Sequence, residues 1–142
     1  MTDTPHSGGF ELHPTLAADT VRVADLGLSR LLLMNDRRFP WLILVPRRPG
    51  LRDFDDVAGA EKADFHAEID LASAVLREAT GAEKMNVAAL GNMVPQLHVH
   101  VIARFAGDAA WPGPVWGVGQ ADPYQPDEAK GLVSRLSAAF RG

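Results

Sequence analysis

Short blocks of hydrophobic residues alternate with polar, turn-forming residues over most of this chain, a pattern that predicts strands. Residues 41–45 form an unbroken apolar block that ends at Pro46, which favours a buried strand. Residues 30–35 hold a second apolar block, and the polar residues between the two blocks predict a hairpin with a long loop. Alternation predicts further strands at 84–90 and 96–104, and weaker signals predict strands at 20–25 and 10–12, the last interrupted by Pro14.

Two helices are predicted from apolar stripes. The first stripe recurs at spacings of four, three and four residues: Phe65, Ile69, Ala72 and Leu76. Gly81 is a natural stop for this helix. The second helix is predicted over 126–141, where Pro126 suits the first turn. Its stripe is Leu132, Leu136 and Phe140.

These elements predict an α+β domain around an antiparallel sheet, since short consecutive strands accompany one long and one terminal helix. A chain of 142 residues fits a single domain, which we expect over 1–142. Residues 1–9 are polar and predict a loose lead-in. Residues 106–125 hold much of the Gly and Pro and two of the three Trp, so we expect an ordered loop, because Trp is unfavourable in water.

The composition is that of an ordinary globular protein, with 46% hydrophobic and 23% charged residues. A net charge of −4 gives no support to nucleic-acid binding, which usually needs a basic face. The absence of cysteine excludes a disulfide framework, a thiolate nucleophile and a cysteine metal cluster. The N-terminus does not resemble a secretory signal, and no segment approaches 18 uninterrupted apolar residues. We therefore expect a cytoplasmic protein that does not interact with a membrane.

Residues 96–104 carry the most informative pattern in the chain. A period of two places one set of residues on a single strand face: Gln96, His98, His100, Ile102 and Arg104. The opposite face is entirely apolar. Two imidazoles at positions i and i+2 have Cα atoms roughly 6.5–7 Å apart, close enough to share one phosphate or one metal ion. Imidazole is also the side chain best suited to nucleophilic or proton-transfer chemistry near neutral pH.

Three interpretations of this histidine pair remain open. The two residues could simply belong to a solvated sheet face. A metal site would need a third or fourth ligand, and the remaining candidates lie on unrelated segments: His6, His13, His66, Asp36, Asp108 and Asp122. Nucleophilic attack on phosphorus needs one neutral imidazole, and a second imidazole can donate to a non-bridging oxygen as charge develops.

The segment His98-Val99-His100-Val101-Ile102-Ala103-Arg104 resembles the signature of the histidine triad superfamily, in which histidines alternate with apolar residues. The similarity extends over roughly 20–105. It includes an Asn at a strand end, a strand at 40–46 bounded by prolines, and a long helix followed by a strand. The resemblance implies an antiparallel sheet of about five strands with one long helix and a C-terminal helix. It is strongest to bacterial members described as diadenosine-polyphosphate hydrolases.

This resemblance implies a nucleotide hydrolase or nucleotidyl transferase that needs no cofactor and no metal. His98 takes the place of the nucleophile that forms a nucleotidyl-imidazole intermediate, and His100 the place of the residue that holds the α-phosphate. Diadenosine polyphosphates are the favoured substrates, followed by nucleoside phosphoramidates and adenylate esters. Members commonly pair into dimers whose sheets continue across the interface, so the resemblance makes a homodimer a candidate assembly that the sequence alone does not demand.

The resemblance also implies a set of substrate-binding residues. Asn35 matches a polar residue that contacts the ribose hydroxyls, and Asn86 matches an amide that contacts phosphate oxygens. The loop over 91–95 takes the place of a phosphate-contacting loop, in which Asn92 is the side chain suited to this contact.

Two positions depart from the family pattern. Gln96 replaces the first histidine of the triad and keeps a donor and an acceptor, but it cannot titrate. We retain Gln96 as a binding residue and expect activity with an altered rate or pH profile. Trp41 stands where the family often has another histidine, which changes the hydrogen-bond chain behind the site. The alternative function is therefore a catalytically weak nucleotide-binding or regulatory protein.

Overall fold

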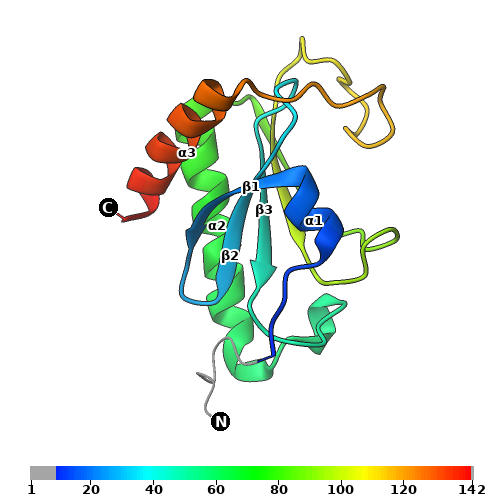
Figure 1. Cartoon of the computed structure of the whole chain (residues 1–142), viewed down its shortest axis with the longest axis vertical. Coiled ribbons are helices and arrows are strands. Elements are labelled where there is room, and N and C mark those ends of the chain that lie inside the picture. Colours follow the sequence, from blue (N-terminus) through cyan, green and yellow to red (C-terminus); the bar gives the residue numbers. More distant parts are fainter. Residues whose placement is uncertain (1–8, 142) are drawn as a thin grey trace.

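Five antiparallel strands form one sheet in the order β1-β2-β3-β5-β4 (Figure 1). The structure is a computed structural model and describes residues 9–141. The strands are β1 (Thr20–Asp25), β2 (Ser29–Met34), β3 (Trp41–Pro46), β4 (Lys84–Ala88) and β5 (Val99–Arg104). The helices are α1 (Pro14–Asp19), η1 (Phe54–Asp56), α2 (Gly59–Thr80) and α3 (Pro126–Arg141). This architecture confirms the predicted α+β fold with one long and one C-terminal helix.

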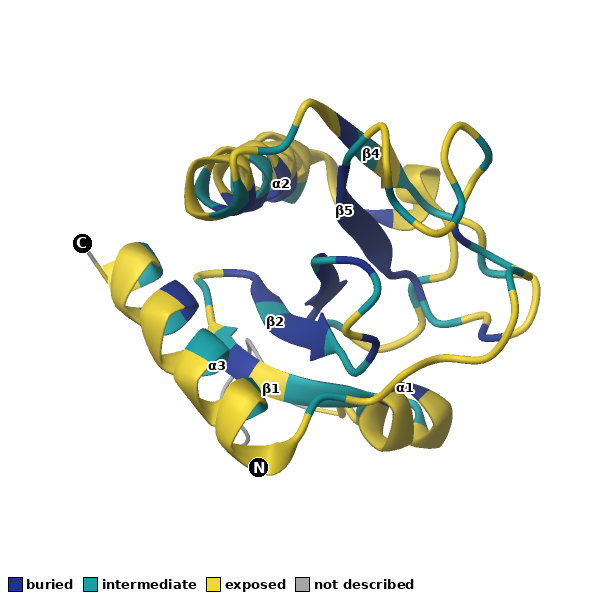
Figure 2. Ribbon diagram, turned by 90° about the horizontal axis from the view of Figure 1, so that it is seen from above, coloured by how far each residue is buried: buried dark blue, intermediate teal, exposed yellow. Residues whose placement is uncertain are grey.

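Helices α2 and α3 lie along one face of the sheet (Figures 1 and 2). Alternate residues of β3 and β5, such as Leu42 and Val101, point into the main hydrophobic core beneath these helices. Residues of the opposite parity, such as Ile43 and Ile102, form a second core with Leu16 of α1. Because both faces of the sheet are covered, the central strands consist of continuous apolar runs in the sequence.

The long helix follows its predicted stripe closely. Its buried residues are Phe65, Ile69, Ala72 and Leu76. Gly81 ends the helix in the left-handed conformation, with φ of 71°, and its N–H donates 2.8 Å to the carbonyl of Arg77. No helix within residues 9–141 is long and apolar enough to cross a membrane.

Two sequence predictions are wrong at the N-terminal side. Residues 10–12 form no strand, and Pro14 begins helix α1 instead of interrupting a strand. Proline suits the first turn of a helix, and the His13 side chain accepts a 3.1 Å hydrogen bond from the N–H of Thr15. The predicted lead-in over 1–9 falls, except for Gly9, outside the described residues.

The two C-terminal strands are shorter than predicted. β4 ends at Ala88, before residues 89–90, and β5 begins at Val99, so residues 96–98 form the entry to the strand. β4 is an edge strand, and Val87 on this strand is 47% exposed.

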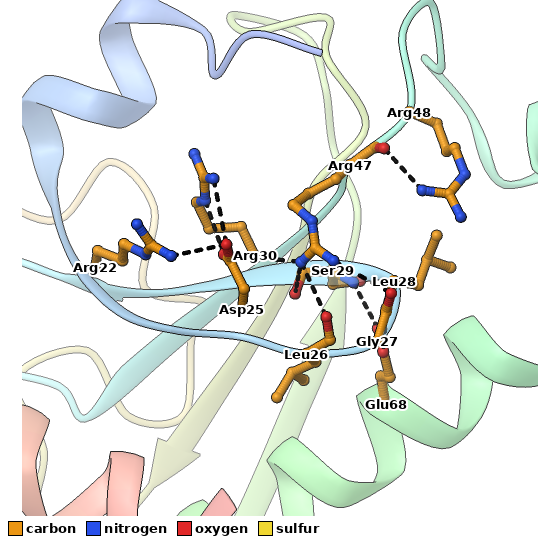
Figure 3. Close-up of polar contacts among 10 residues, drawn as sticks. All are labelled: Arg22, Asp25, Leu26, Gly27, Leu28, Ser29, Arg30, Arg47, Arg48 and Glu68. Atoms are coloured by element: carbon orange, nitrogen blue, oxygen red, sulfur yellow. Dashed lines mark hydrogen bonds and ion pairs between the residues drawn. The ribbon is translucent and has the colours of Figure 1, made fainter. Parts of the chain in front are cut away.

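Arginine and glutamate side chains fix the β1–β2 hairpin to its neighbours (Figure 3). The Glu68 carboxylate of α2 accepts hydrogen bonds from the N–H groups of Leu28 and Ser29 at 2.7 and 2.9 Å. Arg47 donates to carbonyl oxygens of the hairpin, including that of Leu26 at 2.9 Å. Arg48 pairs with Glu61. Arg47 and Arg48 each therefore have a protein partner.

Candidate functional site

The two histidines lie on the same face of the sheet, as the alternation predicted. His98 immediately precedes β5 and His100 lies within it, with ring centroids 4.7 Å apart and planes inclined by 68°. Both are largely buried, at 6% and 5% exposure. Both also line a cavity of about 420 Å³, so their remaining surface faces open space. A solvated sheet face is therefore the wrong description of these residues.

Several elements build the walls of this cavity. Helix α1 provides one wall, the loop over 90–94 provides another, and Met34, Trp41 and Trp116 come from β2, β3 and the loop after β5. The polar members of the lining are Thr15, Asp19, Asn92, His98 and His100. A mostly apolar lining with a few convergent polar groups is typical of a small-molecule site.

The imidazole of His98 is held in one tautomer by the backbone. Its Nδ1 lies 2.7 Å from the carbonyl oxygen of Gln96, and a carbonyl oxygen can only accept a hydrogen bond. Nδ1 therefore carries the proton of the neutral ring, and Nε2 keeps a free lone pair. Burial lowers the pKa of His98, and the neighbouring His13 lowers it further, while the bond to Gln96 opposes both. The ring is neutral at pH 7 and suited to nucleophilic attack through Nε2.

His100 has the opposite tautomer. The indole N–H of Trp41 donates a 3.0 Å hydrogen bond to Nδ1 of His100, which must therefore be the unprotonated nitrogen. Nε2 then carries the proton and can donate to a ligand oxygen. Burial, followed by the proximity of His98, lowers the pKa of His100 to about 4. The site thus presents one bare nitrogen and one N–H group side by side.

Trp116 completes an aromatic enclosure around His100. Its ring centroid lies 5.1 Å from that of His100 and 6.0 Å from that of Trp41, both in edge-to-face geometry. Trp116 belongs to the predicted ordered loop over 106–125. The structure places Trp116 at the cavity, whereas Trp111 stacks on the guanidinium of Arg104.

Arg104 and Asp108 hold this loop in place. The Arg104 guanidinium is fully buried and forms two hydrogen bonds with the Asp108 carboxylate, at 2.8 and 3.0 Å. It also donates 2.8 Å to the carbonyl of Gly113. The Asp108 carboxylate accepts further bonds from the N–H groups of Ala110 and Trp111, and the Arg104 pair holds the pKa of that carboxyl well below its usual range. Arg104 is therefore a structural residue that positions the loop of Trp116.

The four predicted binding residues are not gathered in one place. Asn92 lines the cavity, and its contact with phosphate stays a prediction. Asn35 and Asn86 do not line it: the Asn35 amide oxygen accepts 2.9 Å from the N–H of Tyr124, and that of Asn86 accepts 2.8 Å from Arg104. Their predicted contacts with ribose and phosphate have no counterpart in the present geometry and stay predictions.

Gln96 contacts the N-terminal segment and is also absent from the cavity lining. Its side-chain oxygen accepts 2.8 Å from the N–H of His13, and its amide donates 2.9 Å to the carbonyl of Glu11. These bonds join residues more than 80 positions apart and secure the segment that leads into α1.

The cavity also contains residues that sequence reasoning did not single out. They are Thr15, Leu16, Asp19 and Met34. The first three come from α1, which the sequence did not predict as a helix. Their only sequence signal is the spacing of four between Thr15 and Asp19, which places both on one helix face.

The arrangement of ligating side chains does not favour a metal site. Within residues 9–141, no group of three or more His, Asp or Glu side chains converges as a metal ion would require. Two of the candidate additional ligands have other partners: Asp36 binds Arg38 at 2.8 Å, and Asp108 binds Arg104.

A comparison with protein-family models matches the HIT domain over residues 15–107, more than half of the chain. This protein belongs to the HIT domain family. HIT proteins are generally nucleotide-binding hydrolases or transferases. No curated protein matches the chain.

Solved structures of bacterial HIT proteins agree closely with this one. A histidine triad protein of Sinorhizobium meliloti 1021 is 46% identical, with a TM-score of 0.91 over 94% of this chain and 98% of that chain. One from Bradyrhizobium japonicum is also 46% identical, with a TM-score of 0.89 over 92% and 97%. One from Marinobacter aquaeolei VT8 is 44% identical, with a TM-score of 0.90 over 93% and 96%.

Proposed function

We propose that this HIT protein is a nucleotide hydrolase or nucleotidyl transferase that acts at the α-phosphate through a covalent intermediate on His98. The observation that carries the proposal is the pair of opposite tautomers on one cavity wall. His98 offers the lone pair of Nε2, while His100 offers the N–H of its own Nε2. A nucleophile and an oxyanion donor are the two groups that nucleotidyl transfer requires.

The reaction proceeds in two steps. Nε2 of His98 attacks the α-phosphorus and forms an N–P bond, while the bond from phosphorus to the leaving group breaks and its electron pair departs with that group. The ring becomes an imidazolium, which the Gln96 carbonyl stabilises through Nδ1–H. Water then attacks phosphorus, the N–P electron pair returns to Nε2, and the surplus proton goes to solvent. In a transferase, another acceptor takes the place of water.

The cavity supports binding of a nucleoside beside these histidines. Trp41, Trp116 and Leu16 provide aromatic and aliphatic surfaces suited to a base. Asn92 is the amide side chain available to a phosphate oxygen or a ribose hydroxyl in this cavity. The resemblance of the signature strand favours diadenosine polyphosphates, with phosphoramidates and adenylate esters as further candidates of the same chemistry.

We also propose that the protein forms a homodimer through the outer edge of β4. This edge strand exposes unpaired backbone groups, and Val87, Leu90 and Met93 are 47%, 47% and 93% exposed nearby. An apolar sheet edge favours pairing with another chain. Pairing of two β4 strands would join the sheets of two copies.

A substrate panel on the wild type and on His98→Ala tests the enzymatic proposal. The protein is incubated separately with diadenosine tetraphosphate, with an AMP phosphoramidate and with an acyl-adenylate. The release of AMP from each compound is measured. Mass spectrometry of the acid-labile adduct should find nucleotide on the wild type and none on His98→Ala. His66→Ala is the matched control, since the His66 side chain is 77% exposed on α2.

The catalytically weak alternative and the metal alternative give different results. A protein that binds AMP but releases none from any of these compounds would be a binding or regulatory protein, as the substitutions at Gln96 and Trp41 also allow. Treatment with a chelator should leave turnover unchanged. A loss of activity that zinc restores would favour a metal site at the histidines.

A further inference from the structure

We propose that His13, which lies outside the signature strand, is a positioning residue of the histidine site: Gln96 holds it beside His98, and it fixes helix α1 against the cavity. The inference rests on the proposed function and deepens it. It also gives Gln96, at the first position of the signature, a role in the site although Gln96 does not line the cavity.

The first argument is that Gln96 connects His13 to His98. The side-chain oxygen of Gln96 accepts 2.8 Å from the N–H of His13, and its main-chain carbonyl oxygen lies 2.7 Å from Nδ1 of His98. Its amide also donates 2.9 Å to the carbonyl of Glu11, so the segment before α1 is held at two points. One residue thus secures both the nucleophile and the segment that carries His13.

The second argument is the way in which His13 begins α1. Its Nδ1 accepts a 3.1 Å hydrogen bond from the N–H of Thr15, one of the groups that the first turn of a helix leaves without a helical partner. The N–H of Ala17 donates 3.0 Å to the carbonyl of His13 and closes that turn. His13 is therefore the N-cap residue, a position at which asparagine, aspartate, serine and threonine are preferred.

Helix α1 depends on fixed ends because it is short. It has six residues, and Leu16 is its buried side chain. Its far end is fixed by the N–H of Asn35, which donates 3.0 Å to the carbonyl of Asp19. Thr15, Leu16 and Asp19 all line the cavity, so a loosened first turn would move one wall of the site. His13 itself does not line the cavity and acts on the site through this wall.

The third argument is electrostatic. Burial lowers the pKa of His98, and His13 lowers it further, because a positive charge on one imidazole opposes a positive charge on the other. His13 therefore favours the neutral form of His98, which is the form that attacks phosphorus. The titratable and charged groups on the segments around this pair include Glu11, Asp19, Arg52, Asp53 and His100, and a substitution of His13 leaves all of them in place.

Two substitutions of His13 separate its contributions. His13→Ala removes both the acceptor for Thr15 and the imidazole, whereas His13→Asn keeps an acceptor suited to the cap and removes the imidazole. With an AMP phosphoramidate, the KM of His13→Ala should rise by about threefold to tenfold with a smaller change in kcat. His13→Asn should return KM to within about twofold of the wild type. His66→Ala, exposed on α2, is the matched control and should leave both constants unchanged.

Two further readouts do not depend on turnover. The dissociation constant of AMP should follow KM in both variants, since the same cavity wall is affected. The pKa of His98, followed by NMR, should rise in both variants because each lacks the second imidazole, and it should stay unchanged in His66→Ala. A purely structural effect of His13 would instead leave the titration of His98 unchanged in His13→Asn.

The possible failures are distinguishable. Wild-type KM and AMP affinity in His13→Ala, or a failure of His13→Asn to restore them, would overturn the inference. A titration of His98 that is the same in all four proteins would overturn the placement of His13 beside His98. A wild type that binds AMP but turns over no substrate would instead contradict the proposed function, and the AMP affinities would still test His13.

Discussion

The indole N–H of Trp41 donates a 3.0 Å hydrogen bond to Nδ1 of His100 across two neighbouring strands. An indole nitrogen is a donor only, and it has no protonation change in the physiological range. A histidine at this position, as the family often has, could exchange donor and acceptor roles. Trp41 thus holds His100 in the tautomer that directs an N–H toward the cavity.

Trp41→Phe should remove this constraint. Without the indole donor, the proton of the neutral His100 ring is free to move from Nε2 to Nδ1, which would leave Nε2 without the N–H that a ligand oxygen needs. At pH 7, kcat/KM should fall by about tenfold. Profiles of the wild type, Trp41→Phe and the control Trp111→Phe measure this effect. Equal kcat/KM values at pH 7 in all three proteins would contradict the role assigned to Trp41.

The lowered pKa of His100 should make stability fall in acid. The unfolded chain binds a proton at this residue near pH 6.5, whereas the folded protein accepts it only near pH 4. The free energy of unfolding should therefore decrease as the pH drops from about 6.5 to 4, by about 2 to 3 kcal/mol for this residue. Urea denaturation at pH 7.5 and 4.5 measures the decrease.

His100→Gln supplies the comparison for this measurement, because glutamine does not titrate. The loss of stability between the two pH values should be smaller in the variant than in the wild type. Equal losses would show that His100 titrates alike in the folded and unfolded protein.

Gln96→Glu should weaken substrate binding more than it slows the chemical step. The replacement keeps the acceptor for the N–H of His13 but loses the donor to the Glu11 carbonyl, and it places a negative oxygen against that carbonyl. The segment leading to α1 should loosen, and KM should rise by about threefold to tenfold with a smaller change in kcat. The control is Gln120→Glu, at an exposed position. A change in kcat alone would contradict this positioning role.

Asp108→Ala should be among the most destabilising single changes in the loop over 106–125. It leaves the buried Arg104 guanidinium without its carboxylate, and breaking a buried pair costs about 3 to 5 kcal/mol. Trp116 should become mobile, with a change in its fluorescence. Asp70→Ala, which removes an exposed contact to His66, should cost less than about 1 kcal/mol. Similar decreases in the free energy of unfolding for both variants in urea denaturation would argue that the Arg104–Asp108 pair does not hold the loop in place.

Val87→Glu should convert the proposed homodimer to a monomer. A buried glutamate at the pairing edge of β4 would lack a partner charge, which opposes association. Light scattering of the wild type and the variant at equal concentration measures the change. Arg22→Glu, on the opposite edge strand β1, is the control and should not alter the mass. A monomeric wild type would contradict the dimer directly.

Local patterns in the sequence were sufficient to predict much of the fold. The apolar blocks that became β2 and β3, and the stripe of α2, are visible because side-chain periodicity depends on backbone geometry alone. Helix α1 was missed because six residues are too few for a clear period and its start is secured by His13 and Gln96. The contact with Gln96 spans 83 positions and has no local signal.

The sequence alone determined that two imidazoles share one strand face, since alternation along a strand places residues 98 and 100 together in any extended backbone. Tertiary structure alone decided what each ring can do. The proton of His100 is assigned by an indole 59 positions away, which reaches it because Trp41 pairs with Ile102 in the β3–β5 register. The partners of some arginines were likewise decided in three dimensions, because Arg48 pairs with Glu61 and Arg37 with Glu128 only where separate segments pack together.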